Sequence, residues 1–120
     1  SAQHLYDAQA YDEPNEIVLQ LSHKDVNLGF SKPHKDAILS LRSGMPLTYH
    51  DHCLCLPSTG RDIVQLSTKM KEKLGKWELK GYKVTAARIR FIVAWKSKDA
   101  PRDEKESAIV LADLAMKRIR

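Results

Sequence analysis

The chain has 120 residues, of which 42% are hydrophobic and 29% charged, and its formal net charge is +5. This length and composition predict one domain with a packed core, and they exclude a disordered or collagen-like chain. The longest apolar run, Phe91 to Trp95, is far shorter than a membrane-spanning helix, and we find no apolar signal segment. We therefore expect a soluble chain.

The cysteine content predicts a compartment. Cys53 and Cys55 are the two cysteines, and one residue separates them, so a bridge between them would be strained. Two cysteines are also too few for a disulfide framework. We expect an intracellular, reducing compartment, and the sequence does not distinguish nucleus from cytoplasm.

The N-terminal part of the chain is expected to contain an arm, a strand and a helix. Residues 1–14 are polar with scattered apolar positions, which predicts a flexible arm before a single globular domain at 15–120. The apolar run in 16–22 predicts a strand. Ala37, Ile38 and Leu41 recur at helical spacing after Pro33, which predicts a helix over about 32–43 that ends at Gly44.

The middle of the chain predicts a second strand and the clearest helix. Residues 47–56 have the length and composition of a strand between two prolines. Over 60–74, an apolar stripe recurs at i, i+3, i+7 and i+11, with lysines on the other faces and Gly75 as the end. The stripe consists of Ile63, Leu66, Met70 and Leu74. We expect it to face the core, although such a stripe also suits a partner or a membrane surface.

The C-terminal part predicts strands followed by a helix. A short strand is expected at 77–84 and a longer one at 85–96. In the longer strand, alternation predicts a buried face of Ala87, Ile89, Phe91, Val93 and Trp95, and an outward face of Arg88, Arg90, Ile92, Ala94 and Lys96. A final helix is expected from about 99 to 120, with acidic residues at its start and basic residues at its end.

This order of elements predicts the fold class. Strands and helices alternate along most of the chain, without an internal repeat. We expect an α/β or α+β fold in which a small mixed sheet of three to four strands packs with about three helices.

The charge is unevenly distributed along the chain. Residues 60–98 carry eleven basic and three acidic side chains, whereas 1–59 carry four basic and seven acidic ones. A one-sided basic field attracts nucleic acid or an anionic membrane, although an ordinary solvated lysine face explains the same composition. The candidate nucleic-acid-binding residues are Lys69, Lys73, Lys76, Lys80, Lys83, Arg88, Arg90, Trp77 and Tyr82.

No motif in the sequence predicts catalysis, a cofactor or a metal. His50, His52, Cys53 and Cys55 are potential zinc ligands, but on a strand the histidines and cysteines would point to opposite faces. Catalysis by a thiolate needs a base beside the sulfur. Cys53 directly follows His52, so on a strand the two side chains diverge, which argues against such catalysis. The turn at 58–61 offers an anion site before a helix but lacks the P-loop lysine. We therefore expect no enzyme, no metal and no cofactor.

Two functions follow from the charge pattern. The first is a non-catalytic basic module that binds RNA or DNA through the phosphate backbone, without sequence specificity, over residues 60–98. The alternative is a self-associating structural, matrix-like protein whose basic patch contacts an anionic membrane or a partner protein. The long strand at 85–96 would carry a homo-oligomeric contact in that case.

Overall fold

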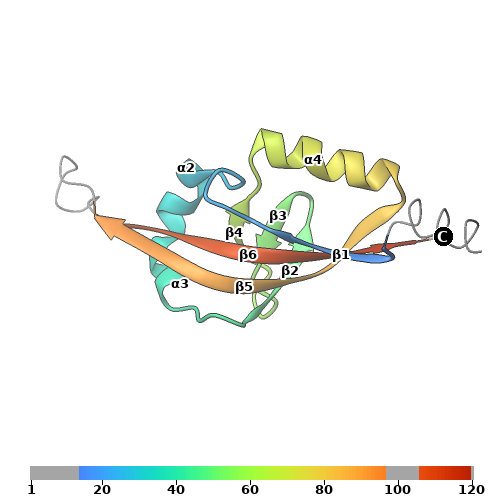
Figure 1. The fold of residues 1–120 in the computed structure, drawn as a ribbon. Coiled ribbons are helices and arrows are strands. Elements are labelled where there is room, and N and C mark those ends of the chain that lie inside the picture. Colours follow the sequence, from blue (N-terminus) through green and yellow to red (C-terminus); the bar gives the residue numbers. More distant parts are fainter. Residues whose placement is uncertain (1–13, 97–105, 120) are drawn as a thin grey trace, which may run out of the picture.

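A computed structural model describes residues 14–96 and 106–119 of the chain (Figure 1). The described strands form one curved antiparallel sheet in the order β1-β6-β5-β2-β3-β4. The strands are β1 (Glu16–Gln20), β2 (Pro46–His50), β3 (Cys53–Cys55), β4 (Asp62–Gln65), β5 (Tyr82–Lys96) and β6 (Glu106–Arg118). The expected sheet of three to four strands packed with about three helices is therefore wrong.

Helical structure is limited to two regions of the described chain. The first is a broken segment made of α2 (Leu28–Ser31), a 3-10 turn (Lys32–His34) and α3 (Lys35–Leu39). The second is α4 (Thr68–Leu79), which lies along one side of the sheet near the start of β5 (Figure 1). Neither region is long and apolar enough to cross a membrane.

The largest difference from the sequence prediction is the last element. The predicted helix at 99–120 is wrong from Glu106 onward, where the chain forms β6, and its first residues lie outside the described part. β6 pairs with β5 along its whole length and with β1 on its other edge. Residues 108–112 are buried on both faces of the strand, and from Ala112 onward the buried residues recur at every second position, as Ala112, Leu114 and Met116. Period-2 burial on a paired strand thus replaces the helical stripe.

The predicted strand at 47–56 is a tight hairpin instead. Asp51 and His52 have φ of 47° and 62°, which suits a two-residue turn whose twist matches the flanking strands. The register pairs His50 with Cys53 directly across this turn. β4 then forms where the start of a helix was expected, because Ile63 and Val64 are both fully buried next to β3.

The helical regions also shift from their predicted bounds. The segment predicted at 32–43 begins earlier, after Asn27, whose side chain accepts from the Phe30 N–H at 3.4 Å. It ends at Leu39. The helix predicted at 60–74 begins only after Ser67 and continues past Gly75, which removes the strand expected at 77–84 up to Tyr82.

Two predicted strands are confirmed. In the second, the inward and outward side-chain faces exchange part-way along the strand. β1 lies within 16–22, and β5 contains 85–96. The β5–β6 register shifts between Ile89 and Phe91, so one extra residue in β5 reverses the alternation of faces. Ala87 and Ile89 are buried as predicted, whereas the other residues of the predicted buried face are exposed, namely Phe91, Val93 and Trp95. Ile92, predicted to face outward, packs against the core instead.

The core lies between the curved sheet and the two helical regions. Ile38 of α3 and Met70 and Leu74 of α4 are at most 1% exposed. They pack against the buried alternation of β5 and β6 and against Leu54 and Ile63 of the small β2–β3–β4 portion. The N-terminal end of the described chain is held at the same sheet, because the Tyr82 hydroxyl donates to the Pro14 carbonyl.

A pair of glycine substitutions tests the extent of α4. Gly75 lies inside the helix with open space around a built Cβ, so Gly75→Ala should raise the free energy of unfolding by about 0.5–1 kcal/mol. Gly81 follows the helix at φ +93°, so Gly81→Ala should lower it. Urea unfolding of both variants gives the measurement. A stabilising Gly81→Ala with a destabilising Gly75→Ala would place the helix end at Gly75.

Candidate nucleic-acid interface

Helix α4 is positioned by its cap and its apolar stripe. The Ser67 hydroxyl accepts from the Met70 N–H at 3.3 Å, which satisfies one of the free donors of the first turn. Met70 and Leu74 are buried one turn apart and attach the helix to the sheet. Past Lys80, the Gly81 N–H bonds to the Glu78 carbonyl and ends the helix.

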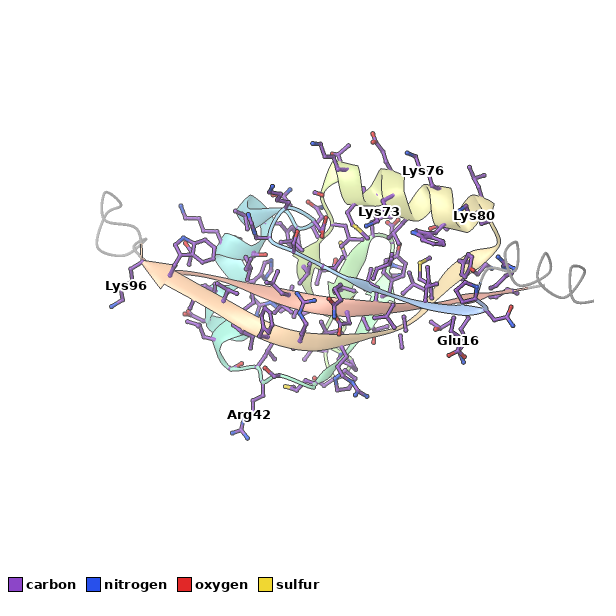
Figure 2. The ribbon with its side chains drawn as sticks, viewed as in Figure 1. Glu16, Arg42, Lys73, Lys76, Lys80 and Lys96 are labelled. Atoms are coloured by element: carbon purple, nitrogen blue, oxygen red, sulfur yellow. The ribbon has the colours of Figure 1, made fainter. Side chains whose placement is uncertain are left out.

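A stripe of lysines runs along α4 beside its buried face. Lys69, Lys73, Lys76 and Lys80 follow one another at i, i+4, i+7 and i+11, which keeps them on one side of an α-helix. All four are exposed. Figure 2 shows three of them spaced along the helix, whereas Arg42 and Lys96 lie on other parts of the molecule. We call Lys69, Lys73, Lys76 and Lys80 the lysine stripe.

Three lysines of the stripe, Lys69, Lys73 and Lys76, are electrostatically available. Among the described residues, no carboxylate lies within ion-pair distance of Lys69, Lys73 or Lys76. With a rise of 1.5 Å per residue, the stripe spans about 16 Å along the helix axis. That length corresponds to about five nucleotides of one strand of a duplex.

The two aromatic candidates contribute little stacking surface. Tyr82 is fully buried, so its ring cannot stack on a base, and this residue leaves the candidate set. Trp77 is half-buried, with its ring edge-on to Tyr82 at 5.1 Å between centroids. The Lys80 ammonium lies over the Trp77 ring at 5.0 Å. Trp77 therefore supports the end of the lysine stripe through packing and a cation–π contact.

The two arginine candidates lie on a different face from the lysine stripe. Arg88 is exposed between the buried residues Ala87 and Ile89, so it points away from the core that α4 covers. Arg90 donates to the Asp113 carboxylate at 3.2 Å and to the Leu21 carbonyl at 2.9 Å. Arg90 is thus bound within the sheet, and the basic segment divides into separate surfaces.

Lys83, near the start of β5, lines a hollow of the surface. This hollow has a volume of about 540 Å³. Lys83 and Glu78 both line it, so a positive and a negative side chain offset one another there. The remaining lining residues are Tyr49, Gly81, Tyr82, Val84 and Ile119. The hollow therefore offers no concentrated positive charge for a phosphate.

The histidine and cysteine cluster is distributed around the β2–β3 hairpin. His50 and Cys53 close the turn, His52 lies in it, and Cys55 is buried at the far end of β3. Within residues 14–96 and 106–119, no three His, Cys, Asp or Glu side chains are placed to hold one metal ion. His52 instead meets the Tyr49 ring edge-on at 6.4 Å between centroids.

Both thiols are held in the protonated form. Burial, followed by the hydrogen bond that the thiol donates to Asp62 at 2.8 Å, raises the pKa of Cys55 to about 11. Burial and the nearby Asp62 charge also raise the pKa of Cys53. A protonated thiol is a poor nucleophile, so these cysteines do not suit nucleophilic catalysis near neutral pH.

Comparison with protein-family models, curated proteins and solved structures finds no match to this chain. The chemistry of the surface is therefore the basis for any function proposed.

One surface feature was hidden from sequence reasoning. Phe91, Val93 and Trp95 alternate like a core face, and only the extra residue at Arg90 turns them outward. A bulge beside an arginine leaves no motif in the sequence, although the long strand itself was predicted. The lysine stripe, in contrast, is visible in the sequence as a second periodic pattern beside the apolar one.

The raised thiol pKa predicts a loss of stability at alkaline pH. Because the unfolded Cys55 ionises near pH 9 and the folded one near pH 11, its stabilising contribution is complete below pH 9 and is lost as pH rises through 11. The loss should be roughly 2–3 kcal/mol. The Cys55→Ala variant should have a lower free energy of unfolding than the wild type at pH 7. Between pH 8 and 11 its free energy of unfolding should fall less steeply than that of the wild type. Equal slopes in urea unfolding of the two proteins would contradict the assignment.

Proposed function

We propose that this protein is a non-catalytic module that binds nucleic acid through the lysine stripe of α4. The observation that carries the proposal is the set of exposed lysines at helical spacing, three of which have no carboxylate partner among the described residues. Lysines clustered along one helix face are a typical electrostatic footprint of nucleic-acid binding.

The contacts available on this surface are with phosphates rather than bases. Lysine ammonium groups act as point charges that neutralise the backbone without reading sequence. Tyr82 is buried and Trp77 is half-buried beneath Lys80, so the two aromatic candidates leave little ring surface for stacking beside the stripe. Binding is therefore expected to be independent of sequence and strongly dependent on salt.

We assign fewer residues to the proposed interface than the sequence suggested. The lysine stripe is the proposed binding surface, and Lys83, which shares its hollow with Glu78, is not assigned to it. Arg88 faces away from α4, and Arg90 is bound to Asp113 and Leu21, so neither belongs to it. A surface made only of helix lysines also suits an anionic bilayer, and the experiment below includes that ligand.

The proposal predicts a salt dependence and a matched pair of variants. Four phosphate contacts on duplex DNA should give a slope of log affinity against log salt of about −3.5. Lys69→Gln/Lys73→Gln/Lys76→Gln should weaken binding at least about tenfold and reduce the slope to about −1. Arg42→Gln/Arg88→Gln/Lys117→Gln removes the same charge elsewhere and should bind nearly as the wild type does.

The measurement is fluorescence anisotropy with labelled single-stranded RNA and duplex DNA over a salt series, beside flotation with phosphatidylserine vesicles. Equal losses in the two triple variants would show that net charge alone attracts the ligand. Binding to vesicles without binding to either nucleic acid would replace this function with the membrane alternative.

A further inference from the structure

An apolar groove lies between the β5–β6 pair and the segment that contains His23 and Leu28. Val93, Trp95, Ile109 and Leu111 form it from the two strands, and His23 and Leu28 close it. Its volume is about 350 Å³. Trp95 and Val93 remain 39% and 37% exposed, and Phe91 continues the apolar surface at 46%. We call this the distal groove.

The edge of β5 next to the distal groove has no strand beside it. β2 pairs with β5 only through Pro46 and Leu47, and the chain before it bonds to Ile89 through Gly44 and Met45. From residue 90 to 96, no described backbone group pairs with β5 on this side. The paired ends of β5 and β6 extend beyond the helices in Figure 1.

The register identifies the unpaired backbone groups. The Ile89 N–H and C=O point toward β2, away from β6. After the extra residue, Phe91 pairs with Leu111 and the alternation continues, so Ile92 and Ala94 direct their N–H and C=O groups to the open side. Such an edge is a template for an added strand.

The charges around the edge select the kind of strand. Lys96 and Arg88 are exposed at the two ends of this part of β5, and Lys24 follows His23 at the rim of the distal groove. Two carboxylates of neighbouring segments are engaged elsewhere, because Asp113 accepts from Arg90 and Asp25 accepts from the Ser22 N–H at 2.7 Å. The edge is thus apolar in its middle and cationic at its ends.

This arrangement disfavours a second copy of the chain as the occupant. Antiparallel self-pairing centred on Val93 would place Arg90 of one copy opposite Lys96 of the other, so the second copy would bring no acidic side chain to Lys96. Ile92, the centre of the homo-oligomeric contact expected from the sequence, is partly buried against the core and so offers little apolar surface to a second copy.

We propose that the open edge of β5 binds an extended segment of a partner protein by strand addition. The segment has apolar residues at every second position and acidic residues at both ends. Its backbone bonds to Ile92 and Ala94, its apolar side chains extend the surface of Phe91, Val93 and Trp95, and its carboxylates meet Lys96 and Arg88. This site is independent of the lysine stripe.

The experiment uses the peptide acetyl-DEVTVTVED-amide as the probe and the full chain as the receptor. Isothermal titration should show binding to the wild type. Ala94→Pro removes one N–H from the open side while the bonds from β5 to β6 remain, since proline is tolerated on an edge strand. Loss of that donor should weaken binding about tenfold. Lys69→Gln/Lys73→Gln/Lys76→Gln is the matched control and should bind the peptide as the wild type does.

Two further probes keep the test decisive if Ala94→Pro folds poorly. N-methylation of the peptide at alternate residues blocks either the amides that face β5 or those that face solvent, so one analogue should bind and the other should not. Equal binding of both analogues would overturn strand addition, as would absence of binding by the parent peptide. The exposed rings of Phe91 and Trp95 also suit stacking by the bases of single-stranded RNA, which is the alternative ligand. RNA binding that is lost in Trp95→Ser, with no binding of the peptide, would assign the groove to RNA instead.

Discussion

The register of the β5–β6 pair is the constraint on which the two surfaces of this protein depend. One residue is inserted in β5 between Ile89 and Phe91, and the strand faces exchange at that point. Before it, β5 contributes Ala87 and Ile89 to the core under α4; after it, Ile92 takes over the inward side. The inserted Arg90 is fixed by Asp113 of β6 and by the carbonyl of Leu21, the residue that follows β1.

The same bulge separates charge from apolar surface. A regular strand would have buried Trp95 and left a mixed face with arginines on it. The observed register uses Arg90 internally and turns the aromatic residues outward at the end far from α4. The lysine stripe and the distal groove therefore lie at opposite ends of the molecule and have different chemistry, which is why a polyanion and a peptide are assigned to different places.

The sequence predicted part of this architecture for identifiable physical reasons. β1, β5 and the buried stripe of α4 were predictable, because each has a strong periodic pattern over its length. β6 was not, because Ala108, Leu111, Leu114 and Ala115 also fit a helical stripe and are good helix formers. Pairing with β5 on one edge and β1 on the other outweighs that preference. The β2–β3 turn contains no glycine, so its usual signal was missing.

Part of the candidate site could likewise be predicted from the sequence, and part could not. The lysine stripe follows from helical spacing and was named in full from the sequence, whereas the burial of Tyr82 and the bonding of Arg90 depend on contacts with distant strands. The helix end was missed because Gly75 resembles a terminator. Only the backbone conformation at Gly81, at φ +93°, identifies the residue that ends α4.

The pairing of β1 with β6 has a consequence for how the chain folds during synthesis. Glu16 pairs with Lys117, so β1 finds its only strand neighbour in the described sheet 101 positions later in the sequence. Until β6 has emerged from the ribosome, β1, which contains Ile17 and Leu19, has no strand to pair with. Contacts between residues so far apart in the sequence form slowly. The emerging protein therefore passes through a stage with β2 to β5 in place and both neighbours of β6 exposed, in which chaperone binding would be most effective.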